Sequence, residues 1–151
     1  MNKRGFSAIE MLVVFVIIGI IAAFGIPRVR NAVIKSNVRS AKAAMGTLMV
    51  KARAAAVSRG CNATVTMTSG LQGTVSISVC TVNGTGTQIL GGVDSLAARF
   101  SVSMAPNPTT MTFDPRGLAT TYVQRVVVFS STDGTISDSV IVNQLGQVVR
   151  Q

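Results

Sequence analysis

The chain begins with MNKRGFSAIEMLVVFVIIGIIAAFGIP, residues 1–27, a segment that favours a long N-terminal helix. After a basic start comes an apolar run, in which the 16 residues 11–26 carry no charge. Counted from Phe6 the run has 21 residues, a length of about 31 Å as an α-helix and enough to span a bilayer. One residue breaks the pattern: Glu10 puts a carboxylate at the start of the run, where an unpaired charge is costly.

A cleaved secretory signal is the alternative interpretation. Such a signal also combines a basic start with an apolar middle, and Ala23 and Gly25 resemble a cleavage site. Three features favour a retained helix instead: the length of the run, the position of Glu10, and Pro27 close after the small residues. We therefore expect the run to stay in the protein as a membrane-spanning helix.

The composition favours a protein associated with a membrane. The 151 residues leave room for one domain plus an extended element, but not for two ordinary domains. Hydrophobic residues make up 48% of the chain and charged residues only 13%, so the chain is more apolar than a typical soluble domain.

The formal charge of +9 is unevenly distributed along the chain. From residue 60 onward four arginines match four aspartates, so this part is formally neutral. Because bases flank both ends of the apolar run, the positive-inside tendency does not decide its orientation. Residues 28–59 hold eight bases and no acid: Arg28, Arg30, Lys35, Arg39, Lys42, Lys51, Arg53 and Arg59.

Residues 28–59 are predicted to continue the helix with an amphipathic pattern. Apolar side chains recur at spacings of three and four, which places them on one helical face. Several are alanines, so a sheet can approach this face closely. We expect one helix from about Phe6 to Arg59, with Pro27 inside it and Gly60 as its C-cap. The predicted face consists of Ile34, Val38, Ala41, Met45, Leu48, Ala52 and Ala55.

Residues 60–151 have the composition of β-structure. Thr, Val and Ser alternate in polarity, helical periodicity disappears, and turn residues separate the segments. We expect two antiparallel sheets or one curved sheet packed on the alanine-rich helix face, which is an α+β fold. The predicted strands are 63–68, 74–80, 99–104, 110–113, 125–130 and 139–142, with a turn at 114–117.

The chain has two cysteines, Cys61 and Cys80. If the region after the apolar run is exported, a disulfide between them would close a loop of about 20 residues and stabilise the fold by roughly 3 kcal/mol. Two buried thiols are the alternative.

Residues 3–10, KRGFSAIE, together with the apolar run resemble the class III leader of type IV pilins and type II secretion pseudopilins. In that family a prepilin peptidase cuts after the glycine and N-methylates the new first residue. The resemblance implies cleavage between Gly5 and Phe6, methylation of Phe6, and Glu10 as the family's characteristic glutamate. The carboxylate of Glu10 would then pair with the freed α-amino group of Phe6, in the same or an adjacent subunit, and direct assembly.

A second resemblance covers much of the chain. Residues 52–60 (ARAAAVSRG), 113–117 (FDPRG) and 140–148 (VIVNQLGQV) look like the GspH/FimT group of minor pseudopilins and minor pilins. Some DNA-binding members of this group carry a Gly-Arg-x-Arg motif near the C-terminus. Residues 146–150 read GQVVR here, so that Gln147 stands in place of the first arginine.

These resemblances imply a leader (1–5), a transmembrane and assembly helix (6–27), an amphipathic stem (28–59) and a β-rich head (60–151). The implied function is a filament subunit of the type II secretion pseudopilus, which serves protein export. The alternative is a FimT-like minor pilin of a type IV pilus that binds DNA during natural transformation. The implied location is the bacterial inner membrane, crossed once, with the head in the periplasm. The implied partners are prepilin peptidase, other pilins or pseudopilins, and inner-membrane lipid before assembly.

Catalysis has little support in the sequence. There is no histidine, the two cysteines lack metal-ligand spacing, and the five acids show no paired arrangement. We therefore expect no catalytic residue, no metal and no cofactor. Arg116, Arg125 and Arg150 are the candidate DNA-binding residues, but the head has no net positive charge and few aromatic side chains on which bases could stack.

Overall fold

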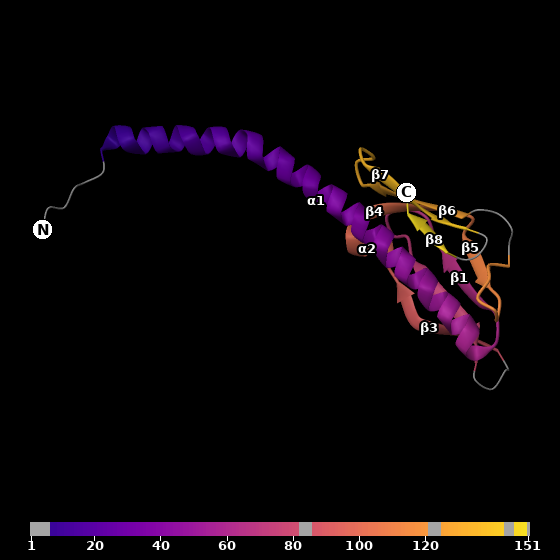
Figure 1. Cartoon of the computed structure of the whole chain (residues 1–151). Helices are drawn as coiled ribbons and strands as arrows, with labels where there is room; N and C mark the ends of the chain where they lie inside the picture. The colour runs from indigo at the N-terminus through magenta and orange to yellow at the C-terminus, as the bar shows by residue number, and fades with distance from the viewer. Residues whose placement is uncertain (1–6, 82–85, 121–124, 144–146, 151) are drawn as a thin grey trace, which may run out of the picture. The chain divides into compact units, whose positions relative to one another are not determined.

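The computed structural model describes residues 7–81, 86–120, 125–143 and 147–150 (Figure 1). The chain divides into two compact units, Met1–Ile34 and Lys35–Gln151. One helix, α1 (Ala8–Arg59), contributes to both units and contains Pro27 in its interior. The predicted continuous helix is therefore confirmed over the described residues.

Gly60 ends α1 in the way the sequence predicts. Its φ of +65° lies in the left-handed region, which a glycine adopts at little cost. The N–H of Gly60 donates to the carbonyl of Val57 at 3.4 Å, and the N–H of Cys61 donates to the carbonyl of Ala56 at 3.2 Å. These two bonds form a Schellman motif, so carbonyls at the end of the helix are satisfied before the chain enters the sheets.

Over the residues that the structure describes, the second unit contains two four-stranded antiparallel sheets. The first has the strand order β3-β2-β1-β5 and the second β4-β6-β7-β8, and a short helix, α2, precedes β4. The elements are β1 (Ala63–Met67), β2 (Val75–Cys80), β3 (Thr87–Asp94), α2 (Leu96–Phe100), β4 (Val102–Asn107), β5 (Thr110–Phe113), β6 (Arg125–Ser131), β7 (Ser137–Val142) and β8 (Val148–Arg150).

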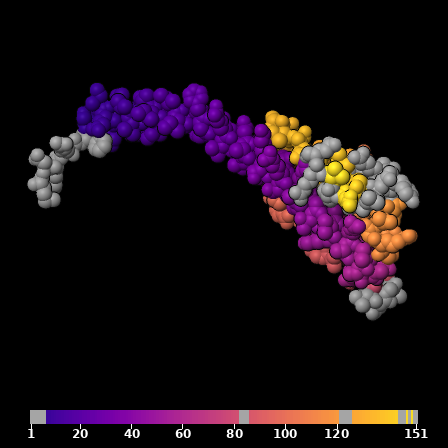
Figure 2. Space-filling view, in the orientation of Figure 1, coloured from indigo at the N-terminus to yellow at the C-terminus, as the bar shows by residue number. Residues whose placement is uncertain are grey.

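A pair of backbone hydrogen bonds joins the two sheets. The N–H of Gly70, in the loop between β1 and β2, donates to the carbonyl of Met104 in β4 at 2.8 Å, and the N–H of Met104 donates back at 3.2 Å. Because both bonds belong to backbone groups, they hold the loop against β4 whichever side chains surround it. In the space-filling view the magenta end of α1 and the orange and yellow strands form one packed body (Figure 2).

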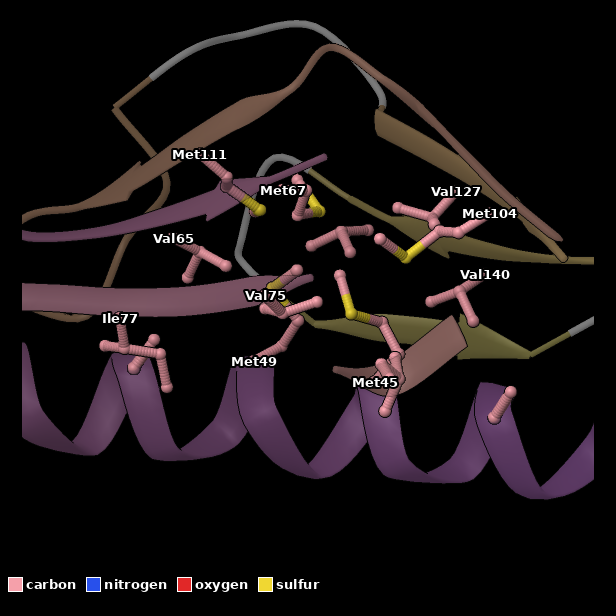
Figure 3. Packing of buried hydrophobic residues seen from close by; sticks show 14 of the residues in the cluster. Met45, Met49, Val65, Met67, Val75, Ile77, Met104, Met111, Val127 and Val140 are labelled. Carbon is pink, nitrogen blue, oxygen red and sulfur yellow. The ribbon is translucent and has the colours of Figure 1, made fainter. Parts of the chain in front are cut away.

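The core of the second unit lies between α1 and the sheets. Figure 3 shows Met45 and Met49 pointing from α1 toward side chains of several strands, including Val75 and Val140. Both methionines are essentially inaccessible to solvent. Flexible, unbranched thioether side chains fill the irregular space between a helix and two sheets well. Of the predicted helix face, Val38, Ala41, Met45, Ala52 and Ala55 are buried, whereas Ile34 and Leu48 are half-buried.

Most of the predicted strands are present, but the prediction for residues 99–104 is partly wrong. Arg99 belongs to α2, and Ser101 follows it with a left-handed φ of +51° before β4 begins. Leu96 and Ala97 explain the difference, since a turn of helix buries both completely. The strands β3 and β8 were not among those predicted from the sequence.

Candidate functional site

Glu10 lies in the first turn of α1. The backbone N–H groups of Glu10 and Met11 donate to the carbonyl of Ser7 at 3.1 and 3.3 Å, so the helix is already formed at this carboxylate. Glu10 is exposed, and a negative charge is favourable at the positive end of the helix dipole. Gly5 and Phe6 lie outside the described residues, so cleavage, methylation and the pairing of Glu10 with the new amine stay predictions.

The apolar segment that follows Glu10 leaves large side chains in contact with solvent. Ile9, Phe15 and Phe24 are each about 70% exposed, far more than expected for a soluble protein. The segment is long and apolar enough to cross a membrane, with a mean hydropathy of 2.8 over 18 residues. Within the first unit no described side chain covers it, so the segment requires lipid or another apolar surface.

The predicted disulfide is formed in the structure between Cys61 and Cys80, which excludes the alternative of two free thiols. It links the residue after the helix cap to the last residue of β2. Arg59 reinforces this junction, because its Nη1 donates to the carbonyl of Cys80 at 2.9 Å. The end of α1 is therefore fastened to the first sheet by a covalent bond and a charge-assisted hydrogen bond.

Lys42 and Asp138 form an ion pair that sequence reasoning missed. The Nζ of Lys42 lies 2.8 Å from Oδ1 of Asp138, and 9% of the lysine side chain is exposed. Burial raises the pKa of Asp138, but the hydrogen bonds from Lys42 and from the N–H of Ser139, together with the charges of Lys42 and Arg39, outweigh it and lower the pKa below the usual value. In the sequence, the only indication was that a lysine lies beside the apolar helix face; the spacing does not indicate which acidic residue pairs with it.

The turn at 114–117 is confirmed as a structural element. Oδ1 of Asp114 accepts hydrogen bonds from the N–H groups of Arg116 at 2.9 Å and Leu118 at 2.8 Å. Gly117 has a φ of +79° and lies against α1, where a Cβ would come within 2.9 Å of Nε of Arg53. The turn therefore lies close against α1, and the positive φ together with the nearby side chains of Arg53 and Val57 favours glycine at this position.

The three candidate DNA-binding arginines lie in different elements. Arg116 is in the turn after β5, and its Nε is 3.4 Å from Oδ2 of Asp114, so its charge is partly balanced. Arg125 pairs with Val142 and Arg150 with Val140, which places both arginines in strands flanking β7 in the second sheet. The side chains of Arg125 and Arg150 lie outside the description, so a cluster of the three stays a prediction.

Among the residues that the structure describes, no group of three or more His, Cys, Asp or Glu could hold a metal ion. The absence of a catalytic residue, a metal and a cofactor is still an expectation from the sequence.

A long N-terminal helix with an exposed apolar first part, followed by two antiparallel sheets packed on its second part, defines a membrane-anchored subunit of the pilin class. The sequence model of the type II transport protein GspH family matches residues 43–146, and the model of the prokaryotic N-terminal methylation motif matches residues 1–26. The chain belongs to the GspH family. It is a minor pilin or pseudopilin of a type IV pilus-like filament, in families whose members are structural subunits that assemble with other pilins.

Solved structures share the fold. Two crystal structures of the type IV minor pilin FimU from Pseudomonas aeruginosa strain PAO1 are similar to this chain. The match to the first has a TM-score of 0.61 and 17% identity, and it covers 78% of this chain and 90% of the crystallised FimU chain. The second, with a TM-score of 0.56 and 18% identity, covers 75% and 91%. A search of curated protein sequences found no significant match.

Proposed function

We propose that the chain is a minor pseudopilin of the type II secretion pseudopilus and serves protein export. The observation that carries this proposal is the match of residues 43–146, most of the second unit, to the type II transport protein GspH family. The Cys61–Cys80 disulfide supports a periplasmic head, since disulfides persist in oxidising compartments. The exposed apolar part of α1 supports a single crossing of the inner membrane before assembly.

A subunit of a type IV pilus is the second candidate, which the shared fold with FimU favours. Inactivating the gene separates the two candidates. Loss of secreted protein from the medium with surface pili intact supports the pseudopilus, and loss of pili with secretion intact supports the pilus. Each phenotype must be restored by the wild-type gene supplied in trans.

Binding of DNA, the activity in the second candidate, has less support. Asp114 partly balances Arg116, and residues 60–151 carry four aspartates for four arginines, so this part has no net positive charge. The full chain in detergent should bind DNA with a strong salt dependence if this activity exists, and Arg150→Ala should weaken that binding. No binding at low salt would exclude it.

Glu10 is assigned the assembly role. Its carboxylate pairs with the α-amino group of Phe6, which becomes free only after the leader is removed, so recruitment depends on processing. Glu10→Leu should leave membrane insertion and cleavage intact but reduce incorporation into the filament by more than about tenfold, because the buried amine loses its partner. Immunoblots of membrane and filament fractions measure both quantities.

Glu10→Gln is the matched variant, because it keeps the shape of the side chain and removes only the charge. It should be defective like Glu10→Leu, whereas Ile9→Leu should incorporate normally. Normal incorporation of Glu10→Leu would exclude the assembly role and leave the carboxylate solvated at the membrane boundary.

A further inference from the structure

The second unit has a surplus of positive charge that it does not neutralise internally. The chain has only five acidic side chains, and Glu10 belongs to the first unit. The four aspartates of the second unit all have local partners. Asp138 pairs with Lys42, Asp94 with Arg99 and Asp114 with Arg116, while Asp133 accepts hydrogen bonds from Ser131 and Thr135. Of the bases on α1 in this unit, all of which the structure describes, only Lys42 forms an ion pair with an aspartate; the charge of Arg39 also acts on Asp138, but without an ion-pair contact.

The remaining bases are not scattered over the helix. Lys35, Arg39, Lys42 and Arg53 follow one another at intervals of four, three and eleven residues, which places them along one line of an α-helix. We call these four residues the basic ridge. It extends over about 27 Å of helix. Lys35 and Arg39 are exposed and Arg53 is half-buried, and none of these three makes an ion pair with any described residue.

Two exposed valines lie beside the C-terminal half of the basic ridge. Val50 and Val57 are 64% and 53% exposed, and their positions on α1 lie within a fraction of a turn of the line through the ridge. Phosphates along a nucleic acid would neutralise the ridge but leave these valines against polar backbone. A protein surface that carries carboxylates beside apolar side chains complements both parts.

One base of the ridge already binds a carboxylate. At its middle, Lys42 donates to a carboxylate oxygen at 2.8 Å, and that carboxylate comes from a strand of a folded protein, namely β7 of the same head. A second copy of this chain is a poor partner for the other three bases, because bases outnumber acids in the chain and its four aspartates already have local partners. Like charges juxtaposed at an interface are costly and select against a wrong partner.

We propose that the basic ridge is the docking surface for a different filament subunit, whose contacting face is acidic. This proposal rests on the proposed function and names the chemistry of the neighbour. It also gives a physical reason for a minor role: a filament built only of this chain would bring unneutralised ridges together, whereas a single copy among acidic subunits places each base beside a carboxylate.

The test uses the full chain in the cells that produce it. A photo-crosslinking amino acid replaces Ala43, which is exposed and lies four residues after Arg39 on α1, one turn along the helix. The crosslinked product from filament fractions is identified by mass spectrometry.

In parallel, Lys35→Glu combined with Arg39→Glu should reduce incorporation by about tenfold or more. Lys51→Glu is the control, because it makes the same exchange at an exposed site on another face of α1; it should incorporate within about twofold of wild type.

Support requires that the crosslink reaches a different pilin-like subunit at a segment with acidic residues, and that reversing those acids to lysine restores incorporation of the double variant. A crosslink to lipid, to nucleic acid or to a second copy overturns the proposal. The proposal is also overturned if the double variant is incorporated into the filament as well as the wild type is. If wild type itself is absent from every filament fraction, the proposed function fails together with this inference.

Discussion

The two parts of α1 remove their apolar side chains from water in different ways. From Ala8 to Ile34 the helix exposes nearly every large apolar side chain, and from Lys35 to Arg59 it buries an apolar face beneath two sheets. The second part finds its apolar partner within its own chain, whereas the first part needs one from outside. Hydrophobic residues of the second unit therefore stabilise the head, whereas those of the first unit need lipid or other subunits to cover them.

A pair of methionines tests this contrast most directly. Met45 is fully buried in the head, while Met11 is 50% exposed in the apolar segment. Met45→Ala should lower the free energy of unfolding of the head by about 2–5 kcal/mol, because it removes packed atoms and leaves a cavity. Met11→Ala should change it by less than about 0.5 kcal/mol. Urea titrations of the full chain in detergent, followed by the β-sheet signal in circular dichroism, measure both. Equal effects would abolish the distinction.

Removing the disulfide should weaken the head alone. The bond closes a loop with a sequence separation of 19, so replacing Cys61 and Cys80 by serine should cost about 3 kcal/mol of head stability. Hydrogen exchange should show faster exchange in β1 and β2 and unchanged exchange in the apolar segment. An unchanged unfolding midpoint, or matching changes in both units, would contradict this expectation.

Acid should affect the head by a smaller amount through Asp138. Its pKa is lowered in the folded state, so it contributes stability at pH values above its usual pKa, and this contribution is lost as the pH falls through the lower, folded value. For a partly exposed pair we expect about 1 kcal/mol or less. Unfolding titrations below about pH 4 should show a shallower loss of stability in Asp138→Asn than in wild type.

The slope that remains in Asp138→Asn is expected from Asp133, whose pKa is lowered by hydrogen bonds from the hydroxyls of Ser131 and Thr135 and from the N–H of Thr135. Identical pH profiles for wild type and Asp138→Asn would show that the Lys42 pair contributes nothing measurable.

The fold was predictable where the pattern in the sequence repeats. Intervals of three and four identified the buried face of α1, and Gly60 after a basic residue identified its end. The strand β3 escaped prediction because Gly91 and Gly92 interrupt its apolar alternation, at the point where its register with β2 shifts. Helix α2 escaped because five residues are too few to show a period, and burial of Leu96 decides the outcome.

The site was predictable where the chemistry is local in sequence. Glu10 was identified from the sequence because an unpaired charge in an apolar run is costly. The two cysteines were identified because two thiols in one exported domain can form a disulfide. The Lys42–Asp138 pair joins residues 96 positions apart, and only the packing of α1 on β7 brings them together. The alignment of Lys35, Arg39 and Arg53 is visible in the spacing, but that none of these bases forms an ion pair with a described aspartate follows only from where each aspartate lies in the fold.

The junction at Cys61 has a mechanical consequence. Its N–H completes the helix cap, and its sulfur is bonded to the end of β2. Tension applied along α1, as a subunit experiences when a filament is pushed or pulled, reaches Cys61 and divides there between the chain entering β1 and the bond to β2. Two neighbouring strands therefore share the load. The residue that ends the helix is thus also the point where force enters the sheet.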